Sequence, residues 1–162
     1  MTERLFMETT QIDPQKTVGQ IMALLVKAGA RQLLQEYDDA GELIGVKFSL
    51  EINKQTVLFS LPSRSETIYK IINGRRQYEG NEEKDRIQSK RVAWRQLLRW
   101  TEAQLALIQT GMVEAGEVFL PYREIEPGVT LWDKIQAAGG RLALPPAPTE
   151  ESNVKRFPEA RL

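Results

Sequence analysis

IGVKFSLEINKQTVLFSLP, residues 44–62, is the stretch that decides the fold of this 162-residue chain. Every second position in its first half is apolar, at Ile44, Val46, Phe48, Leu50 and Ile52. A period of two is typical of a strand that buries one face and exposes the other. The alternation resumes in residues 57–61 after a short polar connection. The stretch therefore predicts two antiparallel strands joined by a tight turn.

The residues before this stretch predict a third strand and a helix that covers the sheet. RQLLQEY, residues 31–37, reads as a short strand, and residues 38–41 have the composition of a turn. The apolar residues of Val18–Ala28 follow a helical period. Asp13-Pro14 is a suitable helix start, with Thr17 as the competing cap. Because a three-stranded sheet with one apolar face needs a covering layer, we expect this helix to supply it.

The second half of the chain has a helical rhythm. Residues 65–73 predict a short helix, and the acids near residues 82–85 favour the start of a long helix that ends near Gly111. Its apolar stripe runs from Ile87 to Met112 with a heptad-like spacing. At about 40 Å this helix is longer than the sheet needs, which predicts an oligomer contact or a protruding arm. The remaining predicted elements are an exposed loop at 75–85, an extended segment at 118–128 and a short helix at 130–138.

These elements together predict the α+β class. The expected order is an N-terminal helix, a three-stranded antiparallel meander and a helical C-terminal half with one long helix. Residues 1–15 lack a sustained period and are interpreted as an N-terminal arm. Residues 16–138 are interpreted as a single α+β domain, and residues 139–162, which contain four prolines, as a flexible tail.

The composition removes several classes of active site. The chain contains neither cysteine nor histidine, which excludes Ser-His-Asp and Cys-His nucleophiles and the usual zinc and iron ligands. No apolar run approaches the roughly 18 residues of a membrane span, and the N-terminus lacks the apolar stretch of a signal peptide. We therefore expect a non-enzymatic, cytoplasmic protein that needs no cofactor and does not associate with membranes.

Acidic residues surround the first predicted turn, at Glu36, Asp38, Asp39 and Glu42. A carboxylate cluster can hold Mg²⁺ for phosphoryl chemistry, which would make the chain a nuclease. Asp-Asp-Ala-Gly is also an ordinary hairpin turn. Because a P-loop glycine pattern and a paired metal-binding signature are both missing, we favour the turn and assign no metal ligand. Whether residues 36–39 bind a metal stays open at this point.

The middle of the chain is basic although the whole chain has no net charge. Residues 64–100 carry a net charge of +5, and both flanks are acidic. Arg91, Arg95 and Arg99 lie four residues apart, on one line of the long helix. Either a phosphate backbone or nearby acids such as Glu102 would offset their mutual repulsion. The candidate nucleic-acid-binding residues are Arg75, Arg76, Lys84, Lys90, Arg91, Arg95, Arg99 and Trp100, the last by stacking on a base.

The segment FLPY, residues 119–122, offers a second kind of site. Phe119, Leu120 and Tyr122 are candidate partner-binding residues on an exposed edge. The alternative is that they attach the C-terminal region to the core. Trp100 also has two interpretations, because an indole beside arginines can either stack on a base or fill a contact with the C-terminal segment.

Several short segments resemble a family of small phage and prophage proteins of unassigned function. They are Lys16-Thr17, Lys27-Ala28-Gly29-Ala30, VKFSLEI, VLFSLP, AWRQLLRWTEAQLALIQTGM and EVFLPY. The resemblance covers about Lys16 to Ile135 and implies a mobile-element setting inside a bacterial cell, with no catalytic residue. The order of helix, meander and long helix is also similar to double-stranded RNA-binding domains and single-strand annealing proteins, where Ser89-Lys90-Arg91 would match a basic helix start.

Two functions are therefore expected. The first is a non-enzymatic accessory protein that binds nucleic acid, single-stranded DNA being one candidate, through the basic helix and as a homo-oligomer. The second is a protein–protein interaction module, an inhibitor or assembly factor acting on a host or phage protein. The basic segment motivates the first, and the over-long helix, the FLPY segment and the missing catalytic residue types motivate the second as its alternative.

Overall fold

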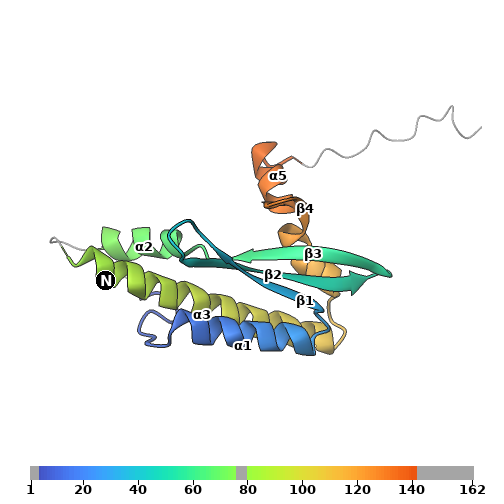
Figure 1. Ribbon diagram of the computed structural model, residues 1–162, viewed down its shortest axis with the longest axis horizontal. Coiled ribbons are helices and arrows are strands. Elements are labelled where there is room, and N and C mark those ends of the chain that lie inside the picture. Colours follow the sequence, from blue (N-terminus) through green and yellow to red (C-terminus); the bar gives the residue numbers. More distant parts are fainter. Residues whose placement is uncertain (1–3, 76–79, 142–162) are drawn as a thin grey trace, which may run out of the picture.

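The computed structural model describes residues 4–75 and 80–141 (Figure 1). The predicted binding residue Arg76 and the tail beyond residue 141 lie outside these ranges. In chain order the elements are α1 (Pro14–Lys27), β1 (Gln32–Tyr37), β2 (Leu43–Ile52), β3 (Gln55–Pro62), α2 (Ser65–Gly74), α3 (Glu82–Gln109), α4 (Ala115–Phe119), the 3-10 helix η1 (Leu120–Tyr122), β4 (Glu124–Glu126), β5 (Val129–Thr130) and α5 (Leu131–Ala137). This mixture of helix and sheet confirms the predicted α+β class.

The three predicted strands form one antiparallel sheet in the order β1-β2-β3. The alternation places Phe48 on β2 opposite Phe59 on β3, and their rings stack with centroids 5.4 Å apart. Asn53 and Lys54 connect the two strands with φ angles of 52° and 64°. This left-handed conformation matches the twist of a two-residue hairpin. The predicted meander and its tight connection are therefore confirmed.

Helices α1 and α3 lie side by side against one face of the sheet (Figure 1). Asp13 caps α1 as predicted, because its carboxylate accepts a hydrogen bond from the backbone N–H of Gln15 at 2.8 Å. Thr17, the competing cap, is fully buried inside the helix. The interior between helices and sheet is apolar, and its largest members are Trp94, Phe48, Phe59, Phe119, Ile21, Leu25, Leu61 and Leu98. The core thus consists of every second residue of the strands and of the apolar faces of α1 and α3.

Helix α3 has 28 residues and begins after Asn81, whose side chain accepts from the Lys84 backbone N–H. Its predicted apolar stripe is wrong at both ends, since Ile87 is 41% exposed and Met112 is 72% exposed. The first turns of α3 pack against α2 rather than the sheet, and Met112 follows the end of the helix. Although α3 is long, neither it nor another described helix is apolar enough to cross a membrane.

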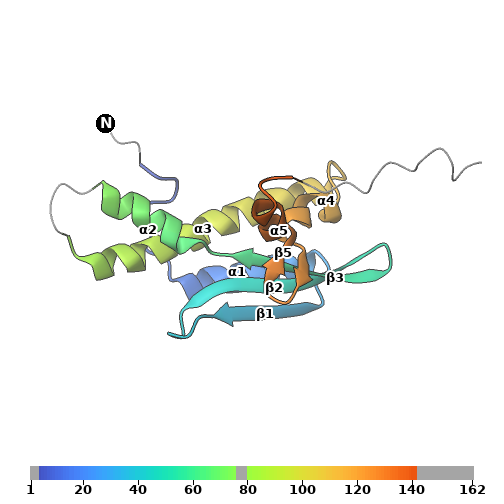
Figure 2. The ribbon, with the colours of Figure 1, turned by 90° about the horizontal axis from the view of Figure 1, so that it is seen from above.

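Strands β4 and β5 and helix α5 lie over the other face of the sheet (Figures 1 and 2). Arg123 forms an antiparallel bridge with Phe59 on β3, and Glu124 forms an ion pair with Lys47 on β2. The predicted extended segment 118–128 is wrong in its first part. Glu114 and Glu117 form a capping box that starts α4, so the chain is helical as far as Tyr122 and is extended only from β4 onward.

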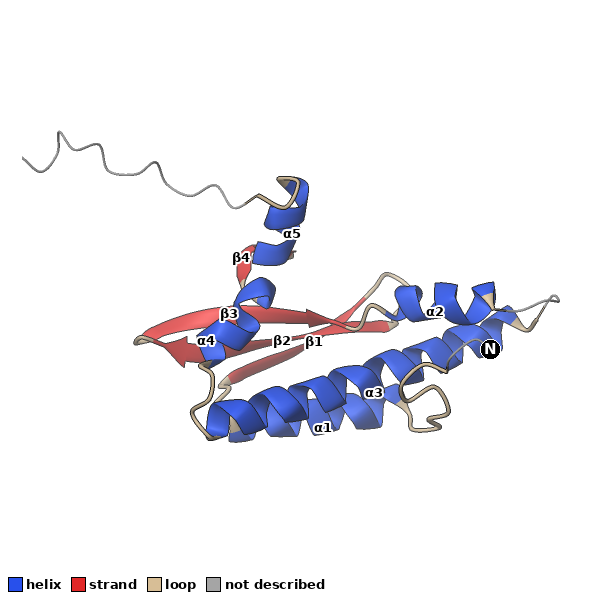
Figure 3. Cartoon of the chain, turned by 180° about the vertical axis from the view of Figure 1, so that it is seen from behind, coloured by secondary structure: helices blue, strands red, loops and turns tan. Residues whose placement is uncertain are grey.

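The described part of the predicted N-terminal arm that precedes α1, residues 4–13, lies along α3 (Figure 3). The side chain of Gln88 donates to the backbone carbonyls of Glu8 at 2.6 Å and Thr10 at 2.9 Å. Gln96, two turns further along α3, donates to the carbonyl of Phe6 at 2.7 Å. A segment without any sequence period is therefore held by side chains of α3 in addition to its own turn hydrogen bonds, such as that from the Glu8 N–H to the Leu5 carbonyl.

Candidate functional site

The basic row of α3 is directed partly into the protein. Arg95 is only 5% exposed and donates to the side-chain oxygen of Gln20 on α1 at 2.7 Å. Arg91 is half-buried and donates to the side-chain oxygen of Gln11 at 3.1 Å, at the end of the N-terminal arm. Since the Arg95 guanidinium is enclosed, it cannot take part in an outer polyanion contact as the sequence suggested.

The other predicted cations are paired with acids. Arg99 lies 2.6 Å from Glu102, Lys90 lies 2.7 Å from Glu42, and Arg75 lies 3.0 Å from Glu8. Lys84 is exposed and has no ion-pair partner among the described residues. The described cations of the basic segment therefore do not gather into one open stripe. The likeness of Ser89-Lys90-Arg91 to a basic helix start also fails, because α3 begins at Glu82 and Ser89 is buried two turns into it.

The described residues of the N-terminal arm cover the start of the basic row, because they contact Arg91 but neither Arg95 nor Arg99. Gln88, Arg91 and Gln96 lie at helical spacing on one side of α3, and all three donate to the arm. The charge pattern drew attention to the arginines and not to Gln88 and Gln96, which also donate to the arm. Amide and guanidinium donors that follow one another along a helix can indicate that another segment of the chain lies against it. Gln88, Arg91 and Gln96 are the donors of this kind on α3.

The acidic turn is a structural feature of the hairpin between β1 and β2. One carboxylate oxygen of Asp38 accepts from the backbone N–H groups of Ala40 and Glu42, at 3.0 and 2.8 Å. Glu36 is engaged with Lys47 at 2.9 Å. Within the ranges that the structure describes, no three acidic side chains are arranged to hold a metal ion. The geometry therefore favours the turn interpretation.

Lys47 occupies the centre of the outer sheet face between two carboxylates. Its Nζ atom lies 2.9 Å from Glu36 and 3.0 Å from Glu124, and its side chain is only 16% exposed. Burial alone would lower the pKa of Lys47, but the hydrogen bonds and charges of both glutamates raise it above 10.5. Burial alone would raise the pKa of Glu124, but the Gly128 backbone N–H and Lys47 lower it below 4.5. This cluster attaches β4 to the sheet.

The structure brings together aromatic residues that the sequence assigned to two different sites. The ring of Trp100 meets Phe119 edge-on at 5.8 Å and Tyr122 at 5.4 Å between centroids. Phe119 is fully buried and also contacts Phe48, so it belongs to the core and does not face a partner. Leu120 is exposed, and Tyr122 is half-buried beside Trp100.

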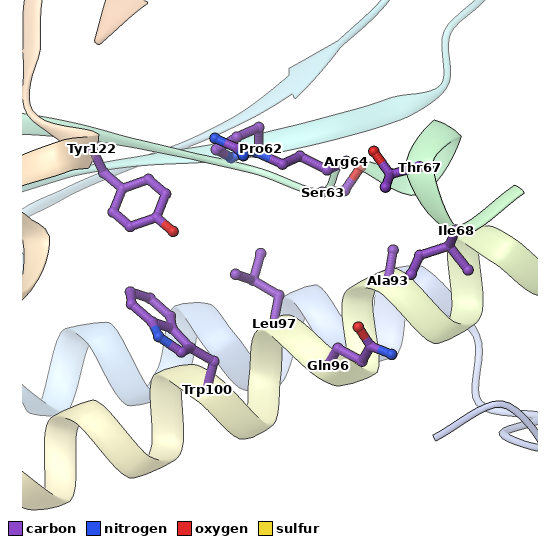
Figure 4. Close-up of a pocket in the computed structure, with 10 residues that line it drawn as sticks. All are labelled: Pro62, Ser63, Arg64, Thr67, Ile68, Ala93, Gln96, Leu97, Trp100 and Tyr122. Atoms are coloured by element: carbon purple, nitrogen blue, oxygen red, sulfur yellow. The ribbon is translucent and has the colours of Figure 1, made fainter. Parts of the chain in front are cut away.

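Trp100 and Tyr122 form one end of a groove of about 340 Å³ between α3 and the junction of β3 with α2 (Figure 4). Leu97 and Gln96 line its α3 side, and the opposite wall comes from Pro62, Ser63, Arg64 and Thr67. We call this hollow the Trp100 groove. Its aromatic and aliphatic lining, with a few hydroxyl and amide groups, is typical of a surface that receives an apolar side chain.

Arg64 separates the Trp100 groove from a second cavity of about 490 Å³ beside α5. It precedes α2 in a left-handed conformation, φ 49°, without a side-chain cap, and it forms no ion pair among the described residues. Trp132 and Asp133 of α5 line the second cavity. Hydrogen bonds from Thr130, helped by the charge of Arg64, hold the pKa of Asp133 below 3.8. The sequence analysis did not identify Arg64, because its position depends on how α2 meets β3.

Comparisons of the chain with protein-family models, with curated proteins and with solved structures give no match. The phage-type resemblance therefore stays a prediction, and the functional argument depends on the geometry of the residues themselves.

Proposed function

We propose that this chain is a non-enzymatic protein–protein interaction module that receives a partner's apolar side chain in the Trp100 groove. The observation that carries the proposal is the groove itself. Trp100, Leu97 and Tyr122 line an accessible hollow, although large apolar side chains generally belong in the core. Trp and Tyr are the residue types that most often supply the binding energy of protein interfaces, where their rings fill desolvated contacts.

The charge distribution supports a protein partner over a polyanion. A nucleic acid needs several cations arranged along its backbone, because each neutralised phosphate releases counterions. In the described part of the chain, Arg75, Lys90 and Arg99 already face acids. The cavity next to the Trp100 groove contributes the carboxylate of Asp133, which would repel phosphates.

Nucleic-acid binding remains the alternative prediction. The specific feature in its favour is that Trp100 and Arg64 line the same groove, which would allow a base to stack in a groove that also holds a cation. On that alternative the ligand would be single-stranded, because a paired base cannot enter a groove of this kind.

A blocking variant tests the protein-binding proposal. Thr67 is exposed on α2 and lines the groove, so Thr67→Arg fills the hollow without changing the core. Thr56→Arg, at an exposed position on β3 outside the groove, is the matched control. Nuclease-treated bacterial lysate is passed over each immobilised protein. We expect a protein that is retained by the wild type and by Thr56→Arg and is lost with Thr67→Arg; identical retention by all three would contradict the proposal.

A titration with DNA separates the two functions. Single- and double-stranded oligonucleotides are added to the wild type at about 50 mM and about 200 mM salt. A protein module should show no binding beyond a weak, non-specific background at either concentration. Tight binding to the single strand that weakens with salt, and that Thr67→Arg abolishes, would establish the nucleic-acid alternative for the same groove.

A further inference from the structure

Strand β1 is an open edge of the sheet. In the order β1-β2-β3, only β2 pairs with it, and no other described strand lies on its free side. Figure 2 shows β1 at the rim of the molecule, with the helices and the C-terminal elements lying away from this edge. The opposite edge is different, because the bridge from Arg123 to Phe59 partly closes β3. β1 therefore presents one row of backbone donors and acceptors that can pair with another strand.

This edge lacks most of the features that normally prevent strands from pairing. Its sequence, QLLQEY, has no proline and no lysine. Leu34 at its middle is 60% exposed on the outer face of the sheet. The only charged side chain, Glu36, is turned toward Lys47 and Ser60 on the neighbouring strands. The bulge between Glu36 and Tyr37 limits regular pairing to the residues before it.

We propose that a second copy of this chain pairs with β1 in antiparallel fashion, so that two three-stranded sheets become one six-stranded sheet. The pairing is centred on Leu34, which faces Leu34 of the other copy. This register places Leu33 opposite Gln35 and Gln32 opposite Glu36. The two leucines then cover each other on the outer face, and each carboxylate of Glu36 meets a neutral amide. A two-fold axis requires this kind of self-complementary register.

The charges at the two ends of β1 support a second copy in this orientation. Arg31 precedes the strand and is mostly exposed, with only a long 3.8 Å contact to Glu51. Asp38 and Asp39 follow the strand in the exposed turn. Antiparallel pairing brings the cationic end of each strand to the acidic end of the other. Parallel pairing would place like charges together.

The expected dimer is reversible. A single pair of six-residue edges covers less than the roughly 1,000 Å² that stable interfaces need, so association should depend on protein concentration in the accessible range. The proposal does not depend on the function of the Trp100 groove, which lies between α3 and α2.

A single cysteine tests the register directly, because the natural chain contains none. Directly opposite Cα atoms in an antiparallel pair are about 4.5–5.5 Å apart, within the range that a disulfide spans. Leu34→Cys should therefore form a covalent dimer under mild oxidation at least about tenfold faster than Val26→Cys, an exposed control on α1. Equal rates for the two variants would overturn the proposal.

Charge variants test the same interface without a covalent bond. By sedimentation velocity, Arg31→Glu should weaken self-association at least about threefold, and Asp39→Lys in the same chain should restore it. Asp39 is chosen over Asp38 because Asp38 holds the turn. Thr67→Arg should leave self-association unchanged. A wild type that remains monomeric at every concentration, or a dimer that both Leu34→Lys and Arg31→Glu leave intact, would contradict pairing at β1.

Discussion

Lys47 on β2 and Glu124 on β4 lie 3.0 Å apart across the outer face of the sheet, although 77 residues separate them in the chain. The Lys47 side chain is 16% exposed and that of Glu124 is 9% exposed, so water screens the pair little. The backbone N–H of Gly128 also donates to Glu124 at 2.8 Å, which fixes the turn between β4 and β5. This contact attaches β4 to the sheet shortly after Tyr122, which lines the Trp100 groove.

Replacing Glu124 should destabilise the fold. Glu124→Gln leaves the Lys47 ammonium with only Glu36 as an acidic partner, and we expect a loss of about 1–3 kcal/mol in the free energy of unfolding. Glu126→Gln on the same strand is the control, since Glu126 and its partner Lys134 are about half exposed. That change should cost no more than about 1 kcal/mol. Urea unfolding measures both free energies. Equal losses would mean that the buried pair of Lys47 and Glu124 stabilises the fold no more than the exposed pair of Lys134 and Glu126.

The stability should fall in acid because of the same carboxylate. The pKa of Glu124 is lowered in the folded protein, so its contribution is complete above the unfolded value near 4.5 and is lost as the pH falls through the lower folded value. Lys47 has a raised pKa, so its contribution is lost only as the pH rises beyond 10.5. The urea concentration at the unfolding midpoint of the wild type should therefore decrease when the pH is lowered below about 4.5. The decrease should be smaller for Glu124→Gln, which lacks this carboxylate.

The fold was largely predictable because local sequence patterns indicate its main helices and strands. The period of two in residues 44–61 and the helical stripe of α1 need no information about distant residues. The helix bounds followed from single caps such as Asp13. The failures at 118–122 and at the ends of the α3 stripe concern segments whose burial depends on which element lies against them.

The candidate site was much less predictable, because it depends on partners far away in sequence. Nothing near Arg95 indicates that Gln20, 75 residues earlier, will accept its hydrogen bond. The acidic partner of Lys90, Glu42, is also far away in the sequence. Trp100 and Tyr122 were both singled out, but only the path of α4 and η1 places them in one groove.

Arg95 and Arg99 should respond very differently to substitution, although both belong to the same row. Arg95→Ala removes a partly buried hydrogen bond to Gln20 and leaves a void where the buried arginine stem lay, so the free energy of unfolding should fall by about 1.5–3 kcal/mol. Arg95→Met should lose less, because it keeps most of the aliphatic stem. Arg99→Ala breaks only an exposed pair with Glu102 and should cost no more than about 1 kcal/mol. Similar losses at both positions, measured in denaturant, would refute the distinction between an enclosed and an exposed cation.

The N-terminal arm should loosen when its glutamine contact is removed. Gln88→Ala deletes the hydrogen bonds to the carbonyls of Glu8 and Thr10. A local loss of about 1.4 kcal/mol corresponds to about tenfold faster hydrogen exchange at the amides of those two residues. Gln109→Ala, at the exposed end of α3, is the control and should leave exchange in the arm unchanged. If the rates in both variants match the wild type, the arm is held by other contacts.

Phe119 should be the most sensitive position in the C-terminal segment. It is fully buried and contacts Phe48, Phe59 and Trp100, so Phe119→Ala removes a ring that joins the sheet to α3. We expect a loss of about 3–5 kcal/mol. Leu120→Ala is the neighbouring control, because Leu120 is 47% exposed and should change stability by less than about 1 kcal/mol. Thermal unfolding monitored by tryptophan fluorescence measures both variants. A small effect of Phe119→Ala would mean that the C-terminal elements are attached mainly through Lys47 and Glu124 and not through the aromatic core.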